Sequence, residues 1–321
     1  MKKLLLFLLL SLLSAGAVHS ADTSGWPTKP VTVIVPFAPG GGTDVQARLM
    51  LKHVEEQLGK PLVIVNRPGA GGEIGMTQIS KAAPDGYTLG VIAYPDSSIR
   101  SGYMDTAYKN DDYVFIGTSV NSPVTFLAGP SSPFKTLDEL IAHYKKTGRP
   151  ITVGVASDAH YLAAKLFADK AGIEITPIFF KSGSAASAAL MGGHVDTQAT
   201  NVQFAVVGNG AGAHVLAIAG DKRIDALPDA KTFKEQGYDV ILKQSRILVA
   251  PKGTPNEVVV LLDERLRNAL SQPDLKENID KTGEVFEPLT GKELENMVQE
   301  TEARLGPVLQ KYGKELVSGQ K

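Results

Sequence analysis

The sequence predicts an α/β fold built from two lobes. Residues 31–93 alternate β-branched, strand-like runs with helix-like segments, which is typical of a parallel sheet covered by helices. A second alternating series runs from about Asp111 to Ala219 and is complete enough to form a domain of its own. With 321 residues, the chain is long for one domain and sufficient for two.

The composition narrows the class of protein. It is 43% hydrophobic and 21% charged, an ordinary globular profile. There are 33 Lys and Arg against 34 Asp and Glu, and the basic residues are scattered, so nothing in the charge favours nucleic acid as a partner. The chain has no cysteine, which excludes disulfides, thiolate catalysis and Cys-ligated metals.

The first twenty residues have the pattern of a secretory signal peptide. Lys2 and Lys3 precede an apolar run over Leu4–Leu13, and small residues follow up to Ser20. The run is shorter than the roughly 20 apolar residues that a membrane span needs. We expect cleavage after Ser20, with Ala17 as the alternative, and therefore an exported, soluble mature protein.

The first unit combines a strand, a glycine loop and a helix. Val31–Val35 is a strand, residues 40–42 are three glycines, and a helix runs from Thr43 to Leu58. Thr43 and Gln46 have capping-box spacing. Free N–H groups and the positive end of the helix dipole meet at this loop, so it predicts an anion site. The Lys of a nucleotide-binding P-loop is missing, so a nucleoside triphosphate is not expected.

A second unit repeats this arrangement. The strand Pro61–Val65 leads into the glycine loop Asn66–Gly72, a helix over Glu73–Ala82 and a strand over Tyr87–Ala93. A dinucleotide fingerprint does not fit, because Ile74 stands where the third glycine belongs. A glycine loop can be no more than a tight turn, but two loops after adjacent parallel strands share one sheet edge, which favours a ligand site.

The second series is less regular. Its predicted strands cover residues 113–117, 124–128, 151–155, 176–180, 195–199 and 215–219. Its helices follow capping residues at Thr136, at Ser157 or Asp158, and at Thr200 with Gln203 three residues on.

The C-terminal part returns to helices. Capping boxes beginning at Thr254 and Thr290 predict helices over Pro255–Ser271 and Gly291–Tyr312. We expect both helices to pack on the first lobe. The chain would then cross between the lobes twice, near residues 120–126 and 245–250, and two crossings make a hinge with a cleft.

Several polar residues lie where strands end, which is where open α/β sheets place ligands. They are Lys181, Thr200 with Asn201, and Arg246, which is equally compatible with a surface position. Asp44 lies in the first turn of its helix, where a carboxylate either stabilises the helix dipole or contacts a ligand through water.

Catalytic chemistry finds little support. Ser157 and His160 have the spacing of a nucleophile and its base, but no Gly-x-Ser-x-Gly elbow is present and a helix cap explains Ser157 equally well. No His-x-x-x-His zinc pattern is present. We therefore predict no catalytic residue, no metal site and no cofactor.

Three motifs resemble those of the tripartite tricarboxylate transporter substrate-binding proteins, also called Bug receptors. They are Pro30–Asp44 (PVTVIVPFAPGGGTD), Asn66–Gly75 (NRPGAGGEIG) and Ala83–Leu89 (APDGYTL), and the similarity continues to Ala250–Pro255 (APKGTP). The resemblance spans nearly the whole mature chain. It implies a two-lobed periplasmic-binding-protein-like fold, a type II solute-binding protein, with the ligand cleft between the lobes.

The resemblance also implies a division of the chain. Residues 1–20 are the signal peptide, and residues 21–124 plus 250–321 form lobe 1 with the glycine loops and the C-terminal helices. Residues 125–249 form lobe 2, which sets specificity. In such proteins the backbone and ordered waters of the two glycine loops hold the ligand carboxylate. The predicted ligand contacts are Phe37, Ala38, Gly40, Gly41, Gly42, Thr43, Asp44, Ala70, Gly71 and Gly72 from the loops, with Ser157, His160, Lys181, Ser182, Thr200, Asn201 and Arg246.

The chain departs from the family pattern at three places, one of which is Val155-Ala156-Ser157-Asp158 in place of a Gly-rich run before the His160 helix. Phe180-Lys181-Ser182 stands where the family usually has Tyr-Lys-Gly, and Ser245-Arg246-Ile247 replaces an aromatic-x-Gly segment. Loss of an aromatic ring with gain of Arg246 leads to the hypothesis that the ligand carries a second acidic group.

The resemblance implies a periplasmic, monomeric receptor that is not an enzyme. It would capture a small organic carboxylate, such as a dicarboxylate or an aromatic carboxylate, and deliver it to the membrane subunits of a tripartite tricarboxylate transporter. A receptor that presents its ligand to a sensor is one alternative. A secreted α/β enzyme acting on a carboxylate is another, for which the sequence supplies no activated nucleophile.

Overall fold

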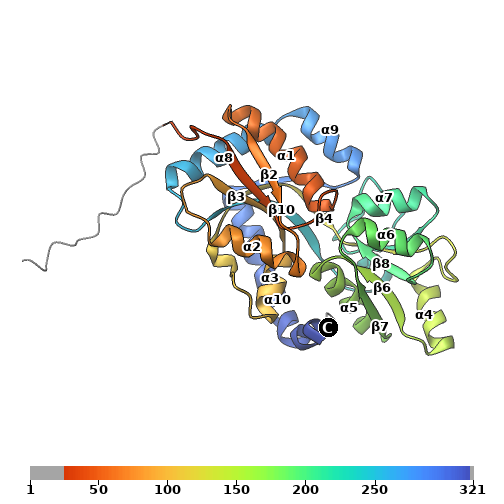
Figure 1. Ribbon diagram of the computed structural model, residues 1–321. Helices are drawn as coiled ribbons and strands as arrows, with labels where there is room; N and C mark the ends of the chain where they lie inside the picture. The colour runs from red at the N-terminus through yellow and green to blue at the C-terminus, as the bar shows by residue number, and fades with distance from the viewer. Residues whose placement is uncertain (1–24, 319–321) are drawn as a thin grey trace, which may run out of the picture.

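The computed structural model describes residues 25–318, and its elements form two α/β halves with one sheet each (Figure 1). The expected signal peptide over residues 1–20 lies outside the described residues. Among the helices of residues 25–318, none combines the length and the apolar character that crossing a membrane requires.

The first half is built on a six-stranded sheet in the order β11-β4-β10-β3-β1-β2. Its strands are β1 Val31–Val35, β2 Leu62–Asn66, β3 Thr88–Tyr94, β4 Tyr113–Pro123, β10 Lys243–Pro251 and β11 Phe286–Thr290. β1 pairs in parallel with β2 and β3, as the first hundred residues predict. β10 and β11 add antiparallel ladders, so the complete sheet is mixed.

The second half is built on a five-stranded sheet in the order β7-β6-β8-β5-β9. Its strands are β5 Thr125–Ala128, β6 Ile151–Val155, β7 Ile175–Phe179, β8 Thr197–Thr200 and β9 His214–Ile218. β6 is parallel to β7 and β8, whereas β5 is antiparallel to β8 and β9. The carboxyl ends of β6, β7 and β8 therefore meet at one edge.

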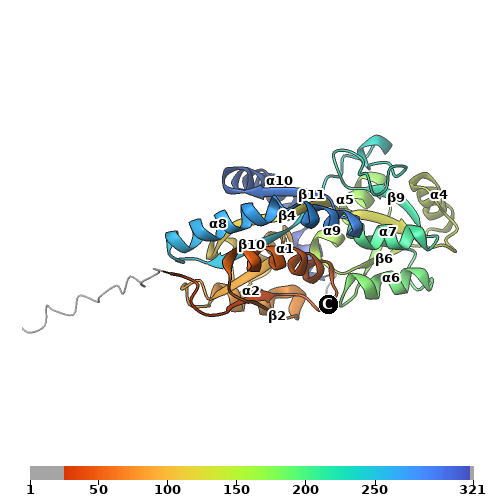
Figure 2. The same ribbon diagram turned by 90° about the horizontal axis from the view of Figure 1, so that it is seen from above.

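Helices cover both faces of each sheet (Figure 2). They are α1 Gly42–Leu58, α2 Glu73–Ser80, α3 Asp96–Tyr103, α4 Leu137–Thr147, α5 Asp158–Ala171, α6 Gly183–Met191, α7 Val202–Gly210, α8 Asn256–Leu270, α9 Pro273–Thr282 and α10 Gly291–Ser318, with short 3₁₀ turns at Ala70–Gly72, Asn110–Asp112 and Lys234–Gln236. In the first sheet Val33 faces α1 and α8, while Ile34 faces α2 and α10, as strand alternation requires. In the second half Phe126 and Phe167 lie in the core with α5.

The two C-terminal helices differ in where they pack. α8 packs on the first half as predicted, since Leu262 shares a core with Met50 of α1. α10 begins against the first sheet through Leu294 but continues to the second half, where Leu305 enters the core that contains α5. The expectation that this helix packs only on the first lobe is therefore wrong for its second part.

Side-chain capping is present at some predicted positions and absent at others. Thr136 caps α4 and Ser157 caps α5, each by accepting a hydrogen bond from a backbone N–H. Thr43 does not cap α1, because the helix already begins at Gly42 with Gly41 as its uncapped N-cap residue. Predicted caps at Thr200 and Thr254 are also wrong, since α7 follows Asn201 and α8 follows Pro255.

Two neighbouring segments connect the halves. β4 ends at Pro123 and β5 begins at Thr125, so the first connection is a single residue. The second connection leads into β10, whose first residue Lys243 is the ladder partner of Pro123. The Val124 N–H donates to the Leu242 carbonyl at 2.9 Å, which ties the two connections side by side.

Candidate functional site

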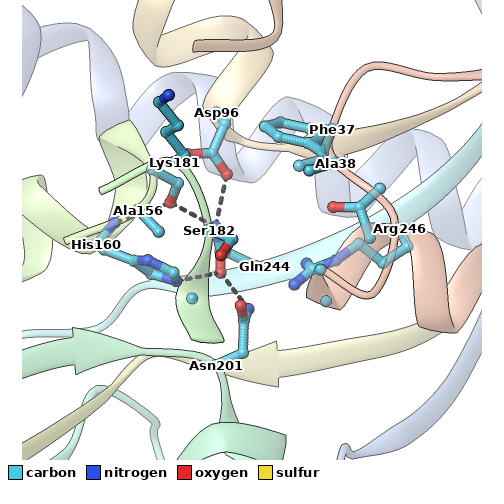
Figure 3. A pocket seen from close by; sticks show the side chains of 16 residues that line it. Phe37, Ala38, Asp96, Ala156, His160, Lys181, Ser182, Asn201, Gln244 and Arg246 are labelled. Carbon is cyan, nitrogen blue, oxygen red and sulfur yellow. Dashed lines mark hydrogen bonds between the residues drawn. The ribbon is translucent and has the colours of Figure 1, made fainter. Parts of the chain in front are cut away.

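A cavity of about 40 Å³ lies between the two halves (Figure 3). It is lined by the loop after β1, the start of α3, the N-terminal ends of α5, α6 and α7, and strand β10. Its lining residues are Phe37, Ala38, Gly41, Gly42, Thr43, Ala93, Asp96, Ala156, Ser157, His160, Lys181, Ser182, Gly183, Asn201, Gln244 and Arg246. The lining therefore comes from both halves of the molecule.

The helix ends around this cavity have positive character. α1 has no side-chain cap at Gly41, so backbone N–H groups in its first turn are open to a ligand. α7 has no side-chain cap at Asn201 either, but its Gln203 N–H donates to Glu284 Oε1 at 3.3 Å. Ser157 and Ser182 cap α5 and α6. Several helix N-termini that point to one small volume favour a bound anion.

The Asp44 carboxylate holds the first glycine loop in place by hydrogen bonds. Its carboxylate accepts hydrogen bonds from the Gly40 amide at 2.9 Å, from Asn66 Nδ2 at 2.8 Å and from Arg48 Nε at 3.0 Å. Burial alone raises the pKa of Asp44, but these hydrogen bonds outweigh it and hold the pKa below its usual value. Asp44 is 2% exposed and does not line the cavity, so its geometry fits a support for the loop.

The second glycine loop lies beside the first. Gly69, Gly71 and Gly72 have positive φ angles, and so does Ala70 at +47°. A Cβ on Gly72 would lie 3.1 Å from the Phe37 ring, so the two loops meet across that side chain. The residues Ala70 and Gly71 line a neighbouring cavity, which shares Ala156 and Ser157 with the first one. The two predicted loops are therefore adjacent, but they line two different cavities.

Gln244 of β10 joins both halves of the molecule behind the cavity. Its Nε2 donates to Asp96 Oδ2 at 2.5 Å and to Ser157 Oγ at 3.2 Å. Its Oε1 accepts from Asn201 Nδ2 at 2.7 Å and lies 3.1 Å from His160 Nε2 (Figure 3). One amide thus fixes side chains from α3, α5 and the start of α7.

We predict that Gln244→Leu lowers the free energy of unfolding by about 2 kcal/mol, because it leaves the Asp96 carboxylate and the Asn201 amide buried without this partner. Urea denaturation measures the loss. Gln46→Leu is the matched control, since buried Gln46 donates one hydrogen bond, to Thr282 Oγ1. Equal losses in the two variants would contradict the joining role of Gln244.

Arg246 enters the cavity from the side opposite His160 (Figure 3). It is 2% exposed, its Nε has no hydrogen-bond partner among the described residues, and its Nη1 reaches the Ser245 carbonyl only at 3.5 Å. Burial lowers the pKa of Arg246, while the negative charges of Glu284 and Asp96 oppose that shift. A guanidinium is charged at any physiological pH, and a buried charge is stable only when it is paired. An anion in the cavity would therefore stabilise Arg246.

His160 supplies no positive charge here. Burial lowers the pKa of His160 to about 4, so the ring is neutral at pH 7. Its Nε2 contacts Gln244, whereas the Ser157 hydroxyl accepts from the His160 backbone N–H at 3.3 Å. The Ser157–His160 spacing is thus used for a helix cap in this structure.

Charged contacts between the halves surround the cavity. Asp96 Oδ1 accepts from the Ala159 N–H of α5 at 2.8 Å. Arg100 Nη1 lies 3.3 Å from Asp158 Oδ2, and both side chains are about 5% exposed. Burial and the neighbouring Asp96 raise the pKa of Asp158 to about 6, against the opposing effect of Arg100.

This shift predicts a pH dependence. Because Asp158 binds its proton more tightly in the folded state, its contribution to stability is present at low pH and is lost as the pH rises through about 6. Between pH 4 and 6 the contribution falls by up to about 1.4 kcal/mol per pH unit. We expect Asp158→Asn to reduce the change in the free energy of unfolding with pH over this range, as measured by denaturant unfolding. A pH slope equal to that of wild type would contradict this role of Asp158.

The cavity brings together most of the predicted site residues. Phe37, Ala38, Gly41, Gly42, Thr43, Ser157, His160, Lys181, Ser182, Asn201 and Arg246 line it. Gly40, Asp44, Gly72 and Thr200 line neither this cavity nor its neighbour, and Ala70 and Gly71 line the neighbouring one. Two lining residues with polar side chains, Asp96 and Gln244, were missed. Asp96 directly follows strand β3 and Pro95, so the rule that selected Lys181 would have found it.

In the part of the chain from residue 25 to the C-terminal helix that the structure describes, no three His, Cys, Asp or Glu side chains are grouped so that they could hold a metal ion.

Comparisons with known proteins agree with this architecture. A family model described as the tripartite tricarboxylate transporter family receptor matches residues 46–314. BugT from Bordetella pertussis is 32% identical over 281 residues, which cover 84% of this chain and 85% of BugT. MatC from Rhodopseudomonas palustris with bound malate superposes with a TM-score of 0.79 at 29% identity, covering 88% of this chain and 100% of MatC. An R. palustris protein with adipate superposes with a TM-score of 0.81 at 26% identity, covering 91% of this chain and 98% of that protein. These similarities confirm the predicted fold class.

Proposed function

The chain belongs to the tripartite tricarboxylate transporter receptor family, whose members are periplasmic solute-binding receptors, and we propose that this member captures a small organic dicarboxylate in the cavity between its halves. The observation that carries the proposal is Arg246. A buried guanidinium with an unpartnered Nε faces helix N-termini without side-chain caps, and a carboxylate supplies the missing charge and acceptors.

A second acidic group on the ligand has its own support. Lys181 also lines the cavity, and it is exposed, so a second carboxylate would lie beside a hydrated cation. Asp96, the one acid among the lining residues, already accepts bonds from the Ala159 N–H and from Gln244. The related proteins with malate and with adipate hold dicarboxylates of different length.

We infer that the two sheets are the cores of the two lobes and that the paired connections at Pro123 and Lys243 are the hinge. Asp96 and Arg100 on α3 face the N-terminus of α5, so contacts between the lobes form beside the ligand. Closure of this kind encloses a ligand and creates a surface that a membrane partner can distinguish from the empty receptor. We also propose that the protein delivers its ligand to the membrane subunits of a tripartite transporter. Residues 1–20 would direct its export to the periplasm.

Isothermal titration calorimetry with a panel of carboxylates tests the proposal. The panel holds chain length fixed in matched pairs, with butyrate against succinate and hexanoate against adipate, and adds malate. We expect each dicarboxylate to bind more tightly than its monocarboxylate partner. Equal affinity within both pairs would contradict the second acidic group, and no binding across the panel would contradict the carboxylate class.

A further inference from the structure

A second cavity lies on the other side of strand β10. This back groove, of about 330 Å³, is lined by Leu166 of α5, by Ile241 and Ser245 at the second connection, and by Met297, Arg304 and Leu305 of α10. It shares no lining residue with the front cavity around Arg246. The back groove is thus a separate space with walls from both halves of the molecule.

Strand alternation explains how one strand serves both spaces. In β10 Gln244 and Arg246 line the front cavity, while Lys243 and Ser245 line the back groove. Ser245 Oγ donates to Asn121 Oδ1 of β4 at 3.1 Å, so the two strands that carry the connections are bonded to each other at the floor of the groove. Front cavity and back groove therefore lie on opposite sides of the proposed hinge.

The back groove has an apolar floor without unmet hydrogen bonds. Leu242 and Leu305 are buried in it, and Leu166, Ile241 and Met297 are half-buried. Its polar members, Asn121, Ser245 and Thr301, all bond within the protein. Among the described residues, no buried side-chain polar atom of the groove lacks a partner. The body of an occupant should therefore be apolar.

The rim of the groove is cationic. Lys170 of α5 and Arg304 of α10 are exposed, and neither has an ion-pair partner within 4.0 Å among the side chains of residues 25–313. The third cation, Lys243, pairs with Asp221 at 3.1 Å and Glu287 at 3.8 Å, and the one acid of the lining is Asp239. Two available cations above an apolar floor complement an anion with an apolar body.

We propose that the back groove binds a small amphipathic anion and that its occupancy favours the closed arrangement of the two lobes. The second part rests on the proposed function, since it takes the paired connections as a hinge. The groove coexists with the contacts between halves at the front, Asp96 to Ala159 and Arg100 to Asp158. Rotation about a hinge changes the spaces on its two sides in opposite senses, so opening the front narrows the groove. An occupant that needs the wide groove therefore stabilises closure.

The probe for the first part is 8-anilinonaphthalene-1-sulfonate, which has one sulfonate on an aromatic body and fluoresces in apolar surroundings. N-phenyl-1-naphthylamine is its uncharged match. We expect the sulfonate probe to bind the full chain more tightly than the uncharged one. The double variant K170E/R304E should bind it about tenfold more weakly, because it reverses both rim charges. K52E is the control on exposed Lys52 of α1 and should bind like wild type.

Each outcome of this titration decides the first part. Absent binding, equal binding of the two probes, or equal binding to wild type and K170E/R304E would each overturn the anion site. All the substituted residues are exposed, so the variants should fold, and circular dichroism checks this. The carboxylate panel is not needed here, so failure of the anion site and failure of the proposed function remain distinguishable.

The second part of the proposal, that occupancy of the back groove favours closure, is tested by measuring the distance between the halves. Because the chain has no cysteine, K60C and K145C add two unique spin-label positions, one before β2 and one on α4. We expect the sulfonate probe to narrow the distance distribution from double electron–electron resonance toward a single population, and to leave it unchanged when K170E/R304E is also present. No change in the labelled parent at saturating probe would overturn the coupling while leaving the anion site intact.

Discussion

Replacement of Arg246 by Ala is expected to weaken binding of the preferred carboxylate by about 100-fold to 1,000-fold, equivalent to roughly 3–4 kcal/mol. The loss is large because the guanidinium is buried and its Nε has no partner in the described part of the chain. A charged hydrogen bond made in a desolvated site exceeds one made at the surface. Calorimetry with the tightest ligand of the panel measures the change.

Two further variants separate the role of Arg246 from that of charge alone. Arg246→Lys keeps the positive charge but loses the planar guanidinium, which can bind a carboxylate with two hydrogen bonds. We therefore expect its affinity for the carboxylate to lie between those of wild type and Arg246→Ala. Lys181→Ala removes an exposed cation of the same cavity, so its effect should be below about tenfold. If Lys181→Ala weakened binding as much as Arg246→Ala does, the positive potential of the cavity in general, and not the buried guanidinium of Arg246, would attract the ligand.

The fold should tolerate Arg246→Ala. Among the described residues the side chain makes one long hydrogen bond, at 3.5 Å to the neighbouring Ser245 carbonyl. Removal of a buried cation relieves a desolvation cost that exceeds the lost attraction to Glu284 and Asp96. Denaturant unfolding of the empty variant should therefore give a free energy no lower than that of wild type. A strong loss of stability would turn the affinity result into a folding effect.

Asp44→Ala is expected to lower the free energy of unfolding by about 3 kcal/mol. The substitution removes the acceptor for the Gly40 amide and for Asn66, both of which hold the first glycine loop. Because this loop lines the cavity through Phe37 and Gly41, carboxylate affinity should fall as well. Urea denaturation followed by calorimetry measures both effects.

Arg48→Ala is the matched control for the Asp44 variant. Arg48 bonds the same carboxylate at 3.0 Å, but its side chain is 50% exposed, so its removal should cost below about 1 kcal/mol. If the two variants lost equal stability, the Asp44–Arg48 ion pair and not the loop contacts would be responsible. If Asp44→Ala lowered affinity without lowering stability, direct or water-mediated ligand contact would be the better account of Asp44.

The glycine loops could be predicted because their information is local. A strand, a glycine loop and a helix start follow one another within about a dozen residues, and the parallel pairing of β1 with β2 and β3 then places both loops at one edge. The helix start itself was wrong by one residue, since the helix includes Gly42 and leaves Thr43 too far in to cap it. Local capping patterns do not distinguish a cap from a position inside the first turn.

The contribution of β10 depends on pairings that local sequence does not carry. Gln244 lies in a strand whose partners are β3 and β4, more than a hundred residues earlier in the chain. Nothing in its own neighbourhood shows that its amide will meet Asp96, Asn201 and His160. Arg246, two residues on, was selected for an expected place at a strand end and for its departure from a family pattern, but the structure places it inside β10. The double role of α10 was missed for the same reason, since an apolar stripe does not tell which core it joins.

The pairing of Pro123 with Lys243 has a consequence for the order in which the molecule can form. The five-stranded sheet comes from one uninterrupted stretch, residues 125–218, whereas the six-stranded sheet needs β10 and β11 and cannot be completed before residue 290 has been made. Contacts between segments so distant form slowly. A growing chain can therefore assemble the inserted half while the half with the glycine loops still lacks its central strand β10. The proposed carboxylate site, which needs that strand, is among the last parts of the protein to form.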